Sequence, residues 1–122
     1  MQKEYGKIYG KNLCGKLSVS ESVSLVHNSD LVISVDSCTA HMAAAFNLPQ
    51  ILIHGTTSLT RWKPKNEKCA VATKKFPCSP CVYQTGAKRL CRGHIPRCML
   101  ALTAEDVIMK IEEIKNDLYT KI

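Results

Sequence analysis

The side chains with the clearest capacity for chemistry lie in one short polar segment, residues 36–41. The segment follows an apolar, β-branched run at 31–35 and precedes a run rich in alanine. Its candidate binding residues are Asp36, Ser37, Cys38, Thr39 and His41. Ligands of open α/β sheets bind beyond the carboxyl ends of the strands, and the free N–H groups at the start of a helix favour phosphate. The segment therefore predicts a site for a phosphorylated ligand.

Each residue type suits one part of such a ligand. The hydroxyls of Ser37 and Thr39 can donate to phosphate oxygens, and the His41 imidazole can reach the same spot from the first turn of the helix. The Asp36 carboxylate can accept hydrogen bonds from a sugar or ribose hydroxyl. The pattern is short, so a second interpretation stays open, in which Asp36 or Ser37 only caps the helix and His41 only packs.

A second candidate site is a cluster of cysteines with the spacing C-x2-C-x9-C-x6-C. Its members are Cys78, Cys81, Cys91 and Cys98, with His94 as an alternative fourth ligand. A C-x2-C pair can hold a tetrahedral metal, and two further thiolates complete a structural zinc site that has no open position for catalysis. Free thiols and disulfides are the alternatives, although the seven cysteines cannot all pair within the chain. The remaining cysteines, Cys14, Cys38 and Cys69, are expected to be free.

These residues need a framework, and the hydrophobic pattern predicts one of α/β type. The first half is expected to contain a helix that Ser18 or Ser20 caps and that runs to about residue 27, a strand at 31–35, a turn at 36–39 and a helix at 40–46. Strands are then expected at 51–53 and 69–73, followed by an irregular Cys-rich loop at 76–100. A closing helix is expected at 104–118, with a capping signature at Thr103. This order indicates a parallel sheet flanked by helices, a partial Rossmann-like fold. The loop at 54–58 is a further candidate for contact with the ligand, with Gly55 as its binding residue and a plain glycine turn as the alternative.

The composition is that of one small globular domain. Apolar residues make up 45% of the 122-residue chain, and the net charge of +7 is spread along it. Such an excess of basic residues is as typical of a solvated basic surface as of a protein that binds an anionic partner. No apolar stretch approaches the roughly 18 residues of a transmembrane helix, and residues 1–16 lack the pattern of a signal peptide. We therefore expect a cytoplasmic protein.

The chain resembles the glycosyltransferase family that contains the lipopolysaccharide heptosyltransferases. The segments that carry the resemblance are 13–18, 29–45, 47–49, 53–57, 61–64 and 102–107, and they include the run Ser34-Val35-Asp36-Ser37-Cys38-Thr39-Ala40-His41. The resemblance implies a GT-B enzyme, in which two Rossmann-like lobes enclose the active site. Residues 1–122 would then form part of the C-terminal, nucleotide-sugar-binding (donor) domain.

The resemblance also implies roles for residues and partners. The donor is typically an ADP-linked heptose, and the acceptor is a lipopolysaccharide or a related glycan. The basic residues near the cysteines could contact the anionic inner membrane or the phosphorylated glycolipid acceptor. Positions that match Asp36, Ser37, Cys38 and His41 lie at the sugar-diphosphate site of the family. Cys38 stands where the family usually has Gly, so its β-carbon narrows the approach to the donor. Catalysis in the family needs no metal cofactor.

The general base of the family lies in the other, N-terminal lobe, where it deprotonates the acceptor hydroxyl. The 122-residue chain alone is therefore expected to be inactive in transfer. A similar Cys-x-x-Cys insertion occurs in relatives, so the cysteine cluster is compatible with the resemblance.

Two other functions stay open on the sequence. A zinc-knuckle nucleic-acid-binding module would use the basic residues near the cysteines, which are Lys74, Lys75, Lys88, Arg89, Arg92 and Arg97. Only Phe76 and Tyr83 are available nearby to stack on bases, and this module leaves the α/β half unexplained, so no nucleic-acid partner is expected. A binding domain without catalytic activity is the third interpretation.

Overall fold

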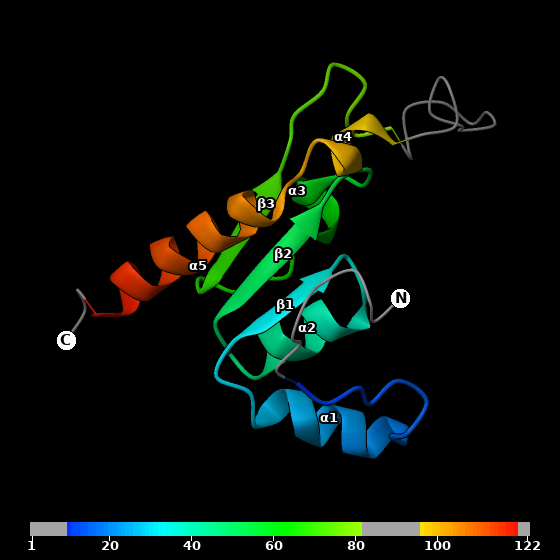
Figure 1. Cartoon of the computed structure of the whole chain (residues 1–122), viewed down its shortest axis with the longest axis vertical. Coiled ribbons are helices and arrows are strands. Elements are labelled where there is room, and N and C mark those ends of the chain that lie inside the picture. Colours follow the sequence, from blue (N-terminus) through cyan, green and yellow to red (C-terminus); the bar gives the residue numbers. More distant parts are fainter. Residues whose placement is uncertain (1–9, 82–95, 120–122) are drawn as a thin grey trace.

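The fold is built on a single parallel β-sheet. The computed structural model describes residues 10–81 and 96–119, without the side chains of 118 and 119. The strands are β1 (Val32–Val35), β2 (Gln50–His54) and β3 (Cys69–Thr73), arranged in the order β1-β2-β3 (Figure 1). The register pairs Val32 with Gln50, and Gln50 with Cys69. The expected α/β fold with a parallel sheet is confirmed, and each strand lies within one residue of its expected bounds.

Helix α1 (Val19–His27) begins where the sequence offers a capping residue. The Ser18 backbone N–H donates to Glu21 Oε2 over 2.7 Å, and the Glu21 backbone N–H donates to Ser18 Oγ over 3.3 Å. This reciprocal pair is a capping box, which satisfies backbone donors that the first turn of a helix leaves unpaired. Of the two serines considered, Ser18 is thus the cap.

Helix α2 (Cys38–Ala45) packs against β1 and β2, and α1 packs against α2. Ala40 and Ala43 are fully buried at this contact, and Ala40 meets Leu52 of β2. Alanine has no side chain beyond Cβ, so the helix can approach the sheet closely. This close packing of α2 on the sheet fixes the start of the helix at the carboxyl end of β1, where the candidate binding residues lie.

Helix α5 (Ala104–Tyr119) covers the opposite face of the sheet, along β2 and β3 (Figure 1). Ile114 packs there against Ile51 and Ala72. The Thr103 backbone N–H donates to Asp106 Oδ2 over 2.9 Å, and the Asp106 backbone N–H donates to Thr103 Oγ1 over 3.4 Å. The capping signature expected at Thr103 is therefore confirmed, and the closing helix extends one residue beyond its expected end.

Three local expectations were wrong. Helix α2 begins at Cys38 and not at residue 40, so Cys38 and Thr39 belong to its first turn. The short helix α3 (Leu59–Trp62) was not expected at all. Helix α4 (Arg97–Leu100) interrupts the region 76–100, which was expected to be irregular throughout. Four-residue helices are too short for a hydrophobic period to show in the sequence, and tertiary contacts decide whether they form.

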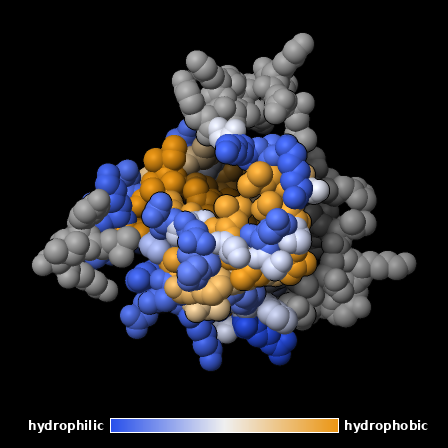
Figure 2. All heavy atoms as spheres, turned by 90° about the horizontal axis from the view of Figure 1, so that it is seen from below, coloured by the Kyte–Doolittle hydropathy of each residue, from blue (hydrophilic) through white to orange (hydrophobic). Residues whose placement is uncertain are grey.

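One face of β1 has no helix packed on it within the described residues, because α5 contacts β2 and β3. Ile33 and Val35 point to that side and are 48% and 52% exposed, whereas Val32 points toward the helices and is buried. Apolar side chains gather at the surface in the view from the α1 end of the molecule (Figure 2). No helix in the described part of the chain is long and apolar enough to cross a membrane.

Candidate functional site

The carboxyl ends of β1 and β2 bring three polar side chains together. Asp36 follows β1, His54 ends β2, and Thr57 lies in the loop after β2. The Thr57 hydroxyl donates to Asp36 Oδ2 over 2.5 Å, and His54 Nε2 lies 2.9 Å from Thr57 Oγ1. Because parallel strands end at the same edge of the sheet, residues 21 positions apart in the sequence meet here.

The direction of these hydrogen bonds fixes the tautomer of His54. A hydroxyl has a single hydrogen, and that of Thr57 is directed at the Asp36 carboxylate, so the oxygen can only accept from His54. His54 must therefore carry a hydrogen on Nε2. Its side chain is buried, and burial lowers the pKa of His54 below its ordinary value of 6.5, although the Asp36 charge and the contact with Thr57 oppose this shift. The neutral Nε2–H form is thus the favoured one near pH 7.

The lowered pKa of His54 makes stability depend on pH. Below about pH 6.5 the unfolded chain binds a proton at this histidine more readily than the folded chain does. We expect the free energy of unfolding to fall as the pH drops through that value and to level off below the folded pKa. Urea unfolding between about pH 7.5 and 5 measures this.

The control for this pH dependence is His54→Gln, which removes the titrating group and should flatten the profile. Carboxylates whose pKa is lowered, such as those of Glu21 and Asp106, lose their stabilising effect only at more acidic pH. An unchanged slope in His54→Gln would assign the effect to another group.

The N-terminus of α2 lies directly beside Asp36. Ser37 is the N-cap residue, but its side chain makes no capping hydrogen bond. Its hydroxyl therefore stays available to a ligand, as do the backbone N–H groups of Cys38 and Thr39, which carry the positive end of the helix dipole. The next N–H group, that of Ala40, donates to the Ser37 carbonyl over 3.1 Å. Cys38 is exposed, Thr39 is half-buried, and His41 is exposed. The five residues proposed from the sequence at 36–41 thus share one segment around an exposed helix start.

Gly55 occupies a crowded position behind this edge rather than an open one. A β-carbon there would collide with Met99 Sδ and would lie 3.3 Å from Cys98 Sγ, both in α4. The glycine is buried, and its carbonyl oxygen accepts a hydrogen bond from Ser79 Oγ over 2.9 Å. Its evident structural role is to let α4 pack against the loop after β2.

The cysteine-rich region contacts the same loop from two sides. The Cys81 backbone N–H donates to the Thr56 carbonyl over 3.1 Å, and Cys98 is buried beside Gly55. Cys78, in contrast, is exposed. Cys91 and His94 lie outside the described residues. Within the described residues, no three His, Cys, Asp or Glu side chains are grouped closely enough to hold a metal ion.

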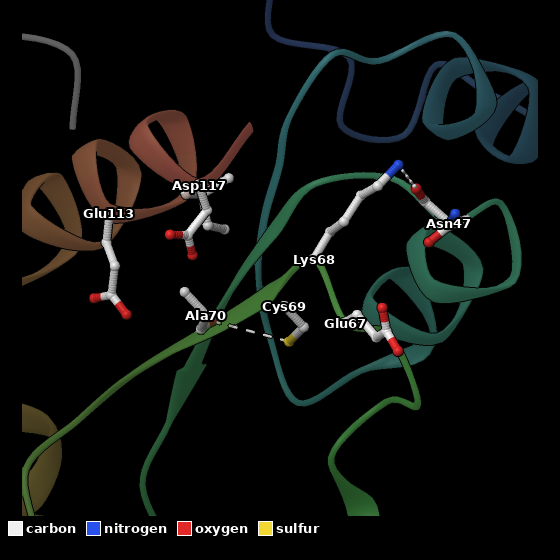
Figure 3. Close-up of a pocket in the computed structure, with 8 residues that line it drawn as sticks. Asn47, Glu67, Lys68, Cys69, Ala70, Glu113 and Asp117 are labelled. Atoms are coloured by element: carbon white, nitrogen blue, oxygen red, sulfur yellow. Dashed lines mark hydrogen bonds between the residues drawn. The ribbon is translucent and has the colours of Figure 1, made fainter. Parts of the chain in front are cut away.

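A pocket of 270 Å³ lies at the other edge of the sheet, where β2 and β3 begin (Figure 3). Glu113 and Asp117 of α5 and Glu67 face it, and Lys68 Nζ donates to the Asn47 carbonyl over 3.1 Å at its rim. Three carboxylates repel an anionic ligand. This pocket is therefore unsuited to a phosphorylated ligand and lies apart from Asp36.

Sequence reasoning proposed the loop at 54–58 for contact with the ligand but named only Gly55 as a binding residue in it, and it missed the connection of His54 and Thr57 to Asp36. The available signal was positional. When two buried strands lie side by side and an Asp follows one of them, a polar residue at the end of the other is a candidate for contact with that Asp. The pairing itself depends on the register of β1 and β2, which aligns Val35 with Ile53 and so sets His54 beside Asp36.

Comparison with known proteins identifies the family. Residues 3–90 match the model of glycosyltransferase family 9 (heptosyltransferase). The chain is 31% identical over 107 residues to lipooligosaccharide heptosyltransferase 2 of Campylobacter jejuni, a match that covers 87% of this chain and 31% of that protein. It is 42% identical over 52 residues to lipopolysaccharide heptosyltransferase 3 of Escherichia coli, which covers 43% of this chain and 15% of that protein.

A third relative is lipooligosaccharide heptosyltransferase 2 of Haemophilus influenzae, 38% identical over 60 residues, or 49% of this chain and 17% of that protein. No solved structure gives a significant match. The family match spans well over half of the chain, so the chain belongs to glycosyltransferase family 9. The chain spans less than a third of the length of each of these relatives.

Proposed function

We propose that this chain is the donor-binding part of a GT-B glycosyltransferase that moves a sugar, heptose in the first instance, from an ADP-sugar to a lipopolysaccharide or related glycan. The observation that carries the proposal is the position of the Asp36 carboxylate beside the open N-terminus of α2, at the carboxyl edge of a parallel sheet. Membership of glycosyltransferase family 9 supports it.

In this proposal the diphosphate of the donor lies at the start of α2. The backbone N–H groups of Cys38 and Thr39 and the hydroxyls of Ser37 and Thr39 donate to the phosphate oxygens, with His41 at the exposed side. The same donors stabilise the charge that develops on the diphosphate as the sugar leaves. Asp36 accepts a hydrogen bond from a sugar or ribose hydroxyl. Cys38 narrows the approach to the donor.

The rest of the reaction needs groups that this chain does not supply. A general base from the other lobe deprotonates the acceptor hydroxyl, and the sugar is transferred with inversion and without a metal cofactor. The net charge of +7 suits a phosphorylated acceptor at the anionic inner membrane surface, so we propose a cytoplasmic protein in peripheral contact with it.

Titration of the isotope-labelled chain, followed by NMR, tests the donor site. We expect ADP-heptose and ADP to shift the amide signals of residues 36–41, and UDP to shift them less. Shifts confined to residues 76–98 on addition of a short oligonucleotide would instead support the nucleic-acid-binding module. If ADP-heptose shifts no signal in residues 36–41, the donor site proposed here is wrong.

We also propose that the cysteine cluster holds a structural zinc through Cys78, Cys81, Cys91 and Cys98, or with His94 as one ligand. Support comes from the contact of both Cys81 and Cys98 with the loop at Gly55 and Thr56. Elemental analysis of purified protein should give about one zinc per chain, as a tetrahedral four-ligand site predicts. Cys81→Ser should lose it, whereas Cys14→Ser, outside the cluster, should not. If neither the original chain nor Cys14→Ser contains zinc, this proposal is wrong.

A further inference from the structure

The loop after β2 does more than connect two elements, because it contacts a candidate ligand-binding side chain directly. Thr57 bonds Asp36 on one side and His54 on the other, and these three residues form a relay in the order His54–Thr57–Asp36. The relay engages Oδ2 of Asp36 and leaves Oδ1 without a partner among the described residues. A carboxylate held through one oxygen presents the other in a fixed direction.

The loop that carries Thr57 is itself anchored from behind. Ser79 Oγ donates to the Gly55 carbonyl over 2.9 Å, and the Cys81 backbone N–H donates to the Thr56 carbonyl over 3.1 Å. Gly55 lets α4 pack against the loop with no β-carbon in the way. The relay thus ends in a buried histidine and an anchored backbone, so Thr57 has little freedom to turn away from Asp36.

We infer that Thr57 and His54 are positioning residues for donor recognition, which act by fixing the orientation of the Asp36 carboxylate toward a hydroxyl of the nucleotide sugar. This inference rests on the proposed function. A preoriented acceptor binds better than a mobile one, because less side-chain freedom is lost when the ligand arrives. His54 contributes by donating to Thr57 Oγ1, which directs the hydroxyl hydrogen at Asp36.

Two variants of the 122-residue chain separate the hydroxyl from the shape of the side chain. Thr57→Val replaces the hydroxyl with a methyl group of similar size, and Thr57→Ser keeps the hydroxyl. We expect Thr57→Val to weaken ADP-heptose binding about tenfold, as loss of a hydrogen bond to a charged group predicts. Thr57→Ser should recover most of that loss.

A double-mutant cycle shows whether Thr57 acts through Asp36. In a chain that already carries Asp36→Asn, Thr57→Val should cost less than about threefold in affinity, because its partner charge is gone. A purely structural role of Thr57 would instead give the same loss in both backgrounds, and that result would overturn the inference.

The relay can be observed without any ligand. Long-range ¹⁵N NMR of the imidazoles should show His54 as the neutral Nε2–H tautomer, with an Nε2–H signal that changes in Thr57→Val and persists in Thr57→Ser. A His54 spectrum that is the same in all three proteins would overturn the relay. If the relay is intact but the original chain does not bind ADP-heptose, the proposed function fails, and the recognition role of the relay fails with it.

Discussion

Replacing Asp36 by Asn should weaken the binding of ADP-heptose by about ten- to a hundredfold, the range expected when a charged hydrogen-bond acceptor is lost. The amide keeps the shape of the side chain, and its oxygen can still accept from Thr57, so the fold and the loop after β2 should persist. What disappears is the charge that a ligand hydroxyl would meet. Calorimetry or NMR titration measures the change in affinity.

The control for this prediction is Asp30→Asn, because Asp30 is exposed and lies before β1, away from the edge that Asp36 occupies. Its affinity for ADP-heptose should match that of the original chain. Unchanged binding in Asp36→Asn would show that the carboxylate takes no part in binding the donor, and tighter binding would show that it repels the diphosphate. Asp36 would then serve the fold rather than the ligand.

Truncation of Leu52 to Ala should lower the free energy of unfolding by about 2–5 kcal/mol. Leu52 is fully buried in the central strand, between Ala40 of α2 and Cys69 of β3. The cavity left by the missing side chain can be filled only if α2 or a neighbouring strand shifts, and such a shift would disturb the close packing of α2 on the sheet. A domain of this size has a total stability of about 5–15 kcal/mol, so the loss should be plain in urea unfolding.

The matched control is Ile33→Ala in β1. Ile33 is 48% exposed, so its removal should cost about 1 kcal/mol or less. A Leu52→Ala protein as stable as Ile33→Ala would mean that α2 does not pack on the sheet as described. The two variants together thus test which face of each strand is buried.

Local signals in the sequence were sufficient for the main elements. Ser18 and Thr103 mark the starts of α1 and α5 because each forms a reciprocal bond with an acidic residue three positions later. The strands were recognisable as short apolar runs. These features depend on neighbours in the chain, and such neighbours are visible in a sequence.

The site was predicted only in part, because its contacts are not local. Asp36 and the residues after it were identified as binding candidates from their position between a strand and a helix. The bond from Thr57 to Asp36 joins two loops, and it exists because the sheet sets their strands in a particular register. The crowding around Gly55 has the same origin, since α4 approaches from residues 97–100.

Pairing each strand with its neighbour in the sequence has a consequence for how the chain folds. Val32 pairs with Gln50 and Gln50 with Cys69, so each pairing closes a segment of 18 or 19 residues. Closing short segments costs less chain entropy than joining distant ones, and such topologies fold faster than those built on long-range pairings. We therefore expect the strand pairings to form before α5 docks, because α5 begins 31 residues after the end of β3. Folding kinetics of variants in β1 and α5 would reveal that order as high φ-values in the former and low ones in the latter.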